Sequence, residues 1–393
     1  MNNERWVLPE GIEELLPQDA YCIEMLRRKL LDLFSSWGYE LVIPPFLEYT
    51  ESLLTGMGSD LDLQTFKLVD QKSGRMMGLR ADMTPQVARI DAHQLGREQP
   101  TRLCYMGTVL RTHADDLSNK RSLMQIGAEL YGHDGVASDI EIIRLMLAML
   151  QGIGLSDIYL DLGHVDIFRS LAQQAGLSAQ QEAQLFDALQ RKAAPEIETI
   201  LKHGDISANV QTMLSELIWL NGGVEVLTRA RQTLKSAPAN VHQAIDNLEF
   251  IAAQLEKSNP QIELHLDLTE LRGYHYHTGV VFAAYKPGVG QSIAQGGRYD
   301  HIGEVFGRAR PATGFTADLR TLVEYSSDTT AQAPAGIYAP ATDDESLSKI
   351  IDELREKGNR VIAALPGQSD DARAMGCDRR LEKQNDKWVV VKA

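Results

Sequence analysis

Two long strand patterns lie next to each other in this chain, at about residues 102–111 and 123–131, with only a short polar loop between them. Strands joined so closely pair antiparallel, because a parallel pair needs a crossover of a dozen or more residues. The pattern becomes almost wholly helical from about 165 to 258, and strands resume at 263–268. These features predict an α+β protein: an antiparallel sheet flanked by helices and interrupted by a helical insertion.

Further elements are predicted on both sides of this pair. Apolar residues at helical spacing fill 18–37, and Gly38 ends the run. The other expected elements are a strand at 39–43, a hairpin of 65–70 with 75–80, a helix from Thr84, a helix at 138–152, strands at 158–162, 280–282 and 291–295, and a helix after Gly314.

The C-terminal part reads as a separate, smaller unit. Residues 325–335 are small, polar and contain proline, which is typical of a linker. Strand and helix patterns then alternate at 336–339, 344–357, 360–364 and 388–391, as in a small α/β unit. The expected domains are therefore 1–324, with the insertion at about 165–258, and 336–393.

The charge of the chain disfavours a broad nucleic-acid surface. The formal net charge is −15, and such a field repels phosphate backbones. The basic patches are short: they lie at 75–80, 308–310 and 379–380. We therefore expect no nucleic-acid partner.

The same sequence indicates a cytoplasmic, non-membrane protein. It has no apolar run of about 18 residues and no apolar stretch after a basic start, so we expect neither a membrane helix nor a signal peptide. The three cysteines, Cys22, Cys104 and Cys377, are widely spaced, which favours reduced thiols over a disulfide framework.

Several common motifs are missing. Gly56-Met57-Gly58 and Gly288-Val289-Gly290 do not complete G-x-G-x-x-G, and no G-K-[ST] occurs. The acidic pair and phosphate loop of a phosphoribosyltransferase are also absent, so the chain itself is not expected to transfer a phosphoribosyl group. His275 and His277 lie on one face of a predicted strand, but no third metal ligand is close in sequence, and we predict no metal or cofactor.

Charged residues and glycines gather where strands end, which a purely structural core would not favour. Any one of these segments is explained by a surface ion pair or a tight turn. Their combination and order are far more specific: they are Leu79–Pro85, Val109–Arg111, Gln125–Glu129, Leu271–Gly279 and Gln295–Asp300.

From about Gly11 to Val323 these segments resemble the histidyl-tRNA synthetase family of class II aminoacyl-tRNA synthetases. Residues 38–45 with Glu48 are similar to motif 1, the dimer interface of that family. The strands with Arg111 and Glu129 are similar to motif 2, and residues 311–315 open motif 3. Residues 272–279 and 296–300 are similar to the two histidine-specific motifs. The resemblance implies the synthetase sheet flanked by helices.

The resemblance also implies a histidine pocket. Asp82, where the family has Glu, would bind the ammonium with help from Thr84 and Gln125, and Glu129 would accept the imidazole N–H. Arg111 or Arg272 would face the carboxylate. Tyr276, His277 and Tyr299 would form the walls, with His277 standing where the synthetases have a second tyrosine.

The ATP-binding parts of the family depart from its pattern. Motif 2 reads Arg111-Thr112-His113, where synthetases carry Glu at the third place. The end of motif 3 has Asp318 in place of glycine and Thr321 in place of the terminal arginine. Adenylyl transfer depends on placed cations, so no independent catalytic activity is expected.

These departures resemble one branch of the family, the regulatory subunits of short-form ATP phosphoribosyltransferase in histidine biosynthesis. The resemblance implies a homodimer through the motif 1 surface, a hetero-octamer with the catalytic subunit, and allosteric feedback inhibition by histidine as effector. Two alternatives stay open: a histidyl-tRNA synthetase or other histidine-activating enzyme, and an amino-acid-binding module with another partner.

Overall fold

A computed structural model describes residues 6–54, 59–114, 119–202, 206–274, 276–326, 334–368 and 371–393. The chain divides into two compact units, one made of Met1–Glu14 with Ile23–Thr329 and the other of Leu15–Cys22 with Thr330–Ala393. None of the helices within the described ranges combines the length and the apolar character that crossing a bilayer requires.

In the described part of the larger unit, nine strands form one sheet in the order β1-β5-β6-β12-β11-β10-β7-β9-β8. Their bounds are β1 Glu40–Leu41, β5 Thr101–Leu110, β6 Ser122–Tyr131, β7 Tyr159–His164, β8 Asn221–Gly222, β9 Glu263–Asp267, β10 Val280–Tyr285, β11 Ser292–Arg298 and β12 Ala312–Asp318. The central pairs are antiparallel, whereas β1–β5 and β7–β9 are parallel. The sheet is therefore antiparallel through its centre and mixed overall.

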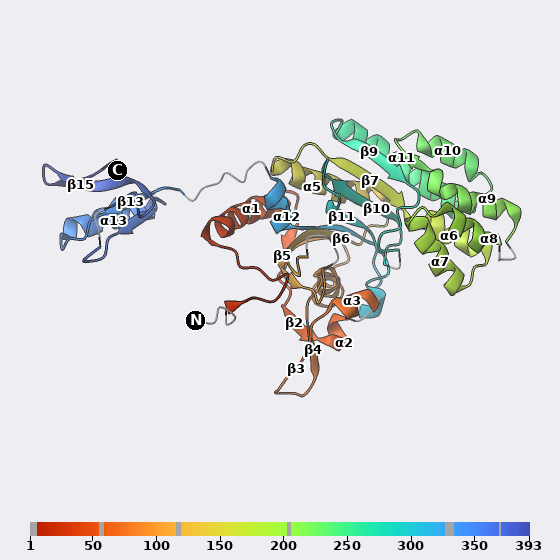
Figure 1. Cartoon of the computed structure of the whole chain (residues 1–393), viewed down its shortest axis with the longest axis horizontal. Helices are drawn as coiled ribbons and strands as arrows, with labels where there is room; N and C mark the ends of the chain where they lie inside the picture. Colours follow the sequence, from red (N-terminus) through yellow and green to blue (C-terminus); the bar gives the residue numbers. More distant parts are fainter. Residues whose placement is uncertain are drawn as a thin grey trace. The chain divides into compact units, whose positions relative to one another are not determined.

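Helices flank this sheet (Figure 1). Their bounds are α1 Pro17–Ser36, α2 Thr50–Leu53, α3 Ser59–Gln64, α4 Thr84–Arg89, α5 Val136–Gly152, α6 Val165–Ala175, α7 Ala179–Gln190, α8 Ala194–Lys202, α9 Ala208–Glu216, α10 Val226–Thr233, α11 Ala239–Ser258 and α12 Leu319–Tyr325. Helix α5 is mostly buried and packs against β6, β11 and β12. From α1, Phe34 meets Phe315 of β12 edge to face, with ring centroids 6.0 Å apart.

The predicted insertion is present as α6–α11, which gather beside β7 and β9 (Figure 1). Helices α6 and α11 pack against each other, and α11 also contacts α5 and β7. After β7 the chain forms these helices, touches the sheet edge only through the two-residue strand β8, and returns as β9, which pairs with β7 from Tyr159↔Glu263 to Leu162↔Leu266.

The predicted helix after Gly314 begins only at Leu319, because Gly314 lies within strand β12. Most of this strand is buried, so its small residues show no alternation of apolar and polar side chains. Period-based reading therefore misses it. The predicted hairpin is confirmed as β3 Lys67–Val69 with β4 Met76–Leu79, and β2 Leu47–Tyr49 completes a small three-stranded sheet in the order β2-β4-β3.

The smaller unit is built on a four-stranded sheet in its described residues, in the order β14-β13-β15-β16. Its elements are β13 Gly336–Ala339, α13 Glu345–Glu356, β14 Val361–Ala363, β15 Cys377–Gln384 and β16 Lys387–Lys392. Strand β15 was not predicted, because most of its side chains are charged. The turn after it has Asn385 and Asp386 at φ values of 48° and 58°, as in a type I′ hairpin turn.

Two of the short basic patches contain arginines that belong to the fold. Arg310 is buried, and its Nη1 donates to both oxygens of Asp91 at 2.8 and 3.0 Å. Arg80 is also buried and donates to the carbonyl oxygens of Pro44 and Thr108. These guanidinium groups therefore satisfy internal acceptors and do not form a basic surface.

Candidate functional site

A cavity of about 920 Å³ opens in the larger unit, over strands β6, β12 and β11. Seven of the predicted binding residues line it: Asp82, Thr84, Glu129, Arg272, Tyr276, His277 and Tyr299. They come from segments more than two hundred residues apart in sequence, so the sheet topology brings them together.

Glu129 of β6 is the most buried of the charged residues that line the cavity, with 1% of its surface exposed. The Tyr105 hydroxyl donates to its Oε1 at 2.9 Å, and the Tyr299 hydroxyl donates to its Oε2. Opposite Glu129 on β12 lies Gly314, where a Cβ would fall 2.5 Å from Cδ of Glu129. Only glycine at that position leaves room for the carboxyl group.

The pKa of Glu129 is raised to about 8, chiefly by burial and in part by the nearby Asp82 carboxylate, although the hydrogen bonds from the tyrosine hydroxyls act in the opposite direction. Among the described residues, neither Glu129 nor Asp82 has a Lys or Arg ion-pair partner. The Tyr276 hydroxyl, also buried, has no hydrogen-bond partner in the described part of the chain. This end of the cavity therefore offers acceptors and an unused hydroxyl to a ligand with N–H groups.

Asp82 is held by its own turn and by Gln125. The Thr84 backbone N–H donates to Oδ1 of Asp82 at 2.7 Å, and Gln125 Nε2 donates to the same oxygen at 3.1 Å. Gln125 also accepts from the Met83 N–H and donates to Thr316 Oγ1. Gln125 is not among the residues that line the cavity, so it orients Asp82 from behind.

Aromatic rings form one wall of the cavity. The rings of Tyr276 and Tyr299 are stacked, with centroids 4.9 Å apart and 23° between their planes, and His277 meets Tyr276 edge to face. The His277 Nδ1 lies 3.2 Å from the carbonyl oxygen of Arg298, and burial lowers the pKa of this imidazole to about 4. His277 is thus a neutral wall residue near neutral pH. His275, the other histidine of the predicted pair, lies outside the described residues.

The two arginines predicted for the ligand carboxylate lie in different places. Arg272 lines the cavity and donates to Gln295 Oε1 at 3.0 Å and to the Tyr285 hydroxyl at 2.6 Å. Arg111, at the end of β5, is not a lining residue, and its Nε points to the carbonyl oxygen of Ala81 at 3.4 Å. The geometry therefore favours Arg272 for a carboxylate inside the cavity.

The end of motif 3 is used to begin helix α12. Asp318 caps this helix, accepting from the Thr321 N–H at 3.1 Å and from its hydroxyl at 2.8 Å. Asp318 also accepts from the Met124 N–H at 2.9 Å. Arg320 donates to Glu13 and to the carbonyl oxygen of Ser122. These residues bind one another and present no free cation for a triphosphate.

Sequence reading missed several residues of the site. Tyr105 lies behind Glu129, and its only sequence signal is the glycine at its cross-strand partner position, Gly127. The insertion contributes Phe186, Gln190 and Lys192 to the lining. The Lys192 Nζ lies 2.7 Å from Asp267 Oδ2, which connects the insertion to the sheet side of the cavity.

We expect the stability of the unliganded chain to fall, relative to Glu129→Gln, as pH rises from about 5 to about 9. Between the ordinary value of 4.5 and the raised pKa of about 8, the folded state keeps a proton on Glu129 that the unfolded state releases. The free energy of unfolding therefore decreases with pH across this window. Thermal melts of both proteins measure the difference, and the acid titration of His277 affects both equally. A difference that stays constant with pH would contradict the prediction.

The sheet, its helices and the cavity define a protein of the histidyl-tRNA synthetase class, and the family described as "Histidyl-tRNA synthetase" matches residues 11–322. A second family, "ATP phosphoribosyltransferase subunit HisZ C-terminal domain", matches residues 334–391. The chain belongs to the family of ATP phosphoribosyltransferase regulatory subunits, as the relatives below show.

The regulatory subunit of Thioalkalivibrio sulfidiphilus (strain HL-EbGR7) is 60% identical over 391 residues, which are 99% of each chain. That of Pseudomonas syringae pv. syringae (strain B728a) is 56% identical over 99% of this chain and 98% of its own. Among solved structures, an ATP phosphoribosyltransferase regulatory subunit/histidyl-tRNA synthetase from Bacillus halodurans C is similar with a TM-score of 0.81 and 28% identity, covering 94% of this chain and 95% of that one. A histidyl-tRNA synthetase from Nostoc sp. PCC 7120, at 18% identity and a TM-score of 0.76 over 98% of this chain and 97% of its own, shares the fold.

Proposed function

We propose that this chain is the non-catalytic regulatory subunit of a short-form ATP phosphoribosyltransferase and that its cavity binds histidine as the feedback effector. The observation that carries the proposal is that two carboxyl groups, Asp82 and Glu129, face one cavity and have no ion-pair partner in the described part of the chain. Histidine carries an ammonium and an imidazole N–H, which such acceptors complement.

The ligand orientation follows from these groups. The ammonium would lie at Asp82, the ring between Glu129 and the Tyr276–Tyr299 stack, and the carboxylate toward Arg272. The Tyr276 hydroxyl, which has no hydrogen-bond partner among the described residues, would provide a further contact. Thr84 and His277 would complete the walls, and Gln125 would orient Asp82. Arg111 would contribute without touching the ligand.

The assembly is part of the proposal. The chain would form a homodimer through the surface of residues 38–48 and join catalytic subunits in a hetero-octamer, in the cytoplasm. Residues 1–324 and 336–393 would be separate domains joined by a linker. The exposed side chains of Leu41, Ile43 and Phe46 support a dimer interface at the surface of residues 38–48.

The decisive experiment measures phosphoribosyl transfer to ATP by the purified catalytic subunit, with and without this chain. Stimulation that added histidine suppresses is expected, because an effector shifts an equilibrium when its affinity differs between two states. Failure of this chain to co-purify with the catalytic subunit or to stimulate it would refute the regulatory function.

A histidine-activating enzyme is the second candidate, since Arg272 lines the cavity as a cation that could face a reacting carboxylate. Histidine-dependent exchange of pyrophosphate with ATP separates the two functions. Clear exchange would support the enzyme. We expect no exchange, because Thr321 carries no charge and its hydroxyl donates to Asp318.

We expect Asp82→Asn to weaken histidine binding about tenfold, because the ammonium would lose a charge-assisted acceptor. The amide keeps the size of the side chain and can still accept the Thr84 N–H. Calorimetric titration of histidine measures the change. Asp246→Asn, which removes a charge from an exposed ion pair with Arg231, is the matched control. Equal affinity of Asp82→Asn and wild type would place the ammonium elsewhere.

A further inference from the structure

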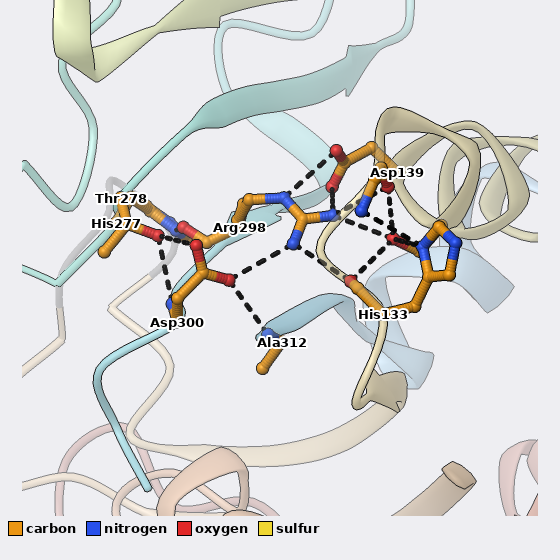
Figure 2. Close-up of polar contacts among 9 residues, drawn as sticks. His133, Asp139, His277, Thr278, Arg298, Asp300 and Ala312 are labelled. Carbon is orange, nitrogen blue, oxygen red and sulfur yellow. Dashed lines mark hydrogen bonds and ion pairs between the residues drawn. The ribbon is translucent and has the colours of Figure 1, made fainter. Parts of the chain in front are cut away.

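A buried charged cluster lies directly behind the aromatic wall of the cavity. Its centre is Arg298 at the end of β11, with 7% of its surface exposed, followed in sequence by the wall residue Tyr299. Figure 2 shows the Arg298 guanidinium between Asp139 on one side and Asp300 on the other. None of these three residues lines the cavity.

The guanidinium donates to acceptors at and just before the start of helix α5, and to Asp300. Its Nε donates to Asp139 Oδ2 at 3.1 Å, and its Nη2 donates to the Ser138 hydroxyl at 2.8 Å and to the Gly135 carbonyl at 3.2 Å. Its Nη1 donates to the His133 carbonyl and to Asp300 Oδ1, both at 3.2 Å. Arg298 thereby fixes the end of β11 against the start of α5.

Asp300 extends this cluster to the other half of the wall. Its Oδ2 accepts from the Thr278 hydroxyl at 3.0 Å, and the Asp300 N–H donates back to the same hydroxyl at 3.0 Å. Its Oδ1 also accepts from the Ala312 N–H at the start of β12 (Figure 2). The Thr278 hydroxyl thus ties the loop carrying Tyr276 and His277 to Asp300, the residue that follows Tyr299 at the strand end.

The backbone supports the same link. The Thr278 N–H donates to the Arg298 carbonyl at 2.7 Å, and the His277 Nδ1 lies near the same oxygen. Gly279 packs so closely against Arg298 that a Cβ there would lie 2.9 Å from Cδ of Arg298. The loop and the strand end therefore meet closely along the backbone, and the Thr278 hydroxyl adds a side-chain link between them.

We propose that Thr278, Asp300 and Arg298 form a relay of hydrogen bonds that positions Tyr276 and His277 relative to Tyr299. Histidine affinity then depends on the Thr278 hydroxyl, although this hydroxyl does not touch the ligand. The inference rests on the proposed function of the cavity. A binding wall made of two segments loses affinity when their spacing is no longer fixed, because ordering the wall then costs free energy at each binding event.

The test compares three variants in the complex with the catalytic subunit, using L-histidine as the probe in calorimetric titration. Thr278→Val keeps the shape and removes the hydroxyl, and we expect about tenfold weaker binding. Thr278→Ser restores the hydroxyl and should return the affinity to near the wild-type value. Thr101→Val is the matched control, because the Thr101 hydroxyl is also buried beside an Arg–Asp pair, Arg310–Asp91, away from the cavity.

The outcomes separate the relay from general destabilisation. Weak binding by Thr278→Val, with rescue by Thr278→Ser and little change in Thr101→Val, supports the relay. Wild-type affinity in Thr278→Val, or an equal loss in Thr101→Val, overturns it while leaving the proposed function intact. If wild-type complex binds no histidine, the proposed effector role fails and the relay with it. Should Thr278→Val not fold, Thr278→Ala removes the same hydroxyl with less bulk.

Discussion

Glu129→Gln is expected to weaken histidine binding about a hundredfold. The substitution keeps the volume of a side chain that is 1% exposed. It exchanges an acidic group for a neutral amide, whose NH₂ end would face a donor hydroxyl of Tyr105 or Tyr299. An imidazole N–H would then lose its carboxyl acceptor, and the amide NH₂ would meet a donor hydroxyl in a buried place, where an unsatisfied polar group costs about 1–3 kcal/mol.

Two measurements check this result. Calorimetric titration gives the affinity, and inhibition of the assembled enzyme should lose its histidine response in parallel. The matched control is Glu141→Gln in helix α5, because Glu141 also accepts from a tyrosine, Tyr39, and from Arg102, but lies outside the cavity. Unchanged affinity in Glu129→Gln, or an equal loss in the control, would remove Glu129 from the binding site.

Gly314→Ala is expected to destabilise the folded chain by about 3 kcal/mol and to abolish histidine binding. The added Cβ would lie 2.5 Å from Cδ of Glu129 and 2.8 Å from the Ala128 carbonyl oxygen. Both neighbours belong to β6, which is paired on its two sides, so the backbone has little freedom to retreat. The carboxyl group would have to move into the space that the ligand needs.

Denaturant unfolding measures the stability, and titration measures the binding. Gly152→Ala near the end of α5 provides the control, since a Cβ there meets no heavy atom within 4 Å. We expect that variant to match the wild type in both measurements. A stable Gly314→Ala protein with normal affinity would mean that the carboxyl group of Glu129 is not confined between β6 and β12.

One-sided burial made helix α1 readable from the sequence. Helix α1 buries Ile23, Leu26, Leu30 and Phe34 on one stripe, so its period is visible in the sequence. Strand β12 is buried along most of its length and is rich in small residues, so no period remains to be read. Strand β15 is the opposite case, because many of its side chains face solvent and are charged.

The residues of the site also divide into those that the sequence motifs indicated and those that they did not. The motifs pointed to Asp82, Glu129 and Tyr299, whose chemistry is unusual for their positions. Tyr105 and Lys192 reach the site region only through cross-strand pairing and through the insertion, which are relations between distant segments. The role of Arg272 relative to Arg111 likewise depends on which guanidinium faces the cavity, a question of geometry that spacing along the chain does not answer.

The strand order of the main sheet has a consequence for how the chain folds during its synthesis. Strand β12 lies between β6 and β11, yet it leaves the ribosome only after the whole helical insertion. Until then β6 has an open hydrogen-bonding edge, and an unpaired apolar edge invites association with other chains. So many non-local pairings give a high contact order, which slows folding.

The β5–β6 pair is joined by one short loop and can form early. The insertion can fold on its own local contacts before β12 is added. The cavity, which needs β6 and β12 side by side, is then completed among the last features of the larger unit.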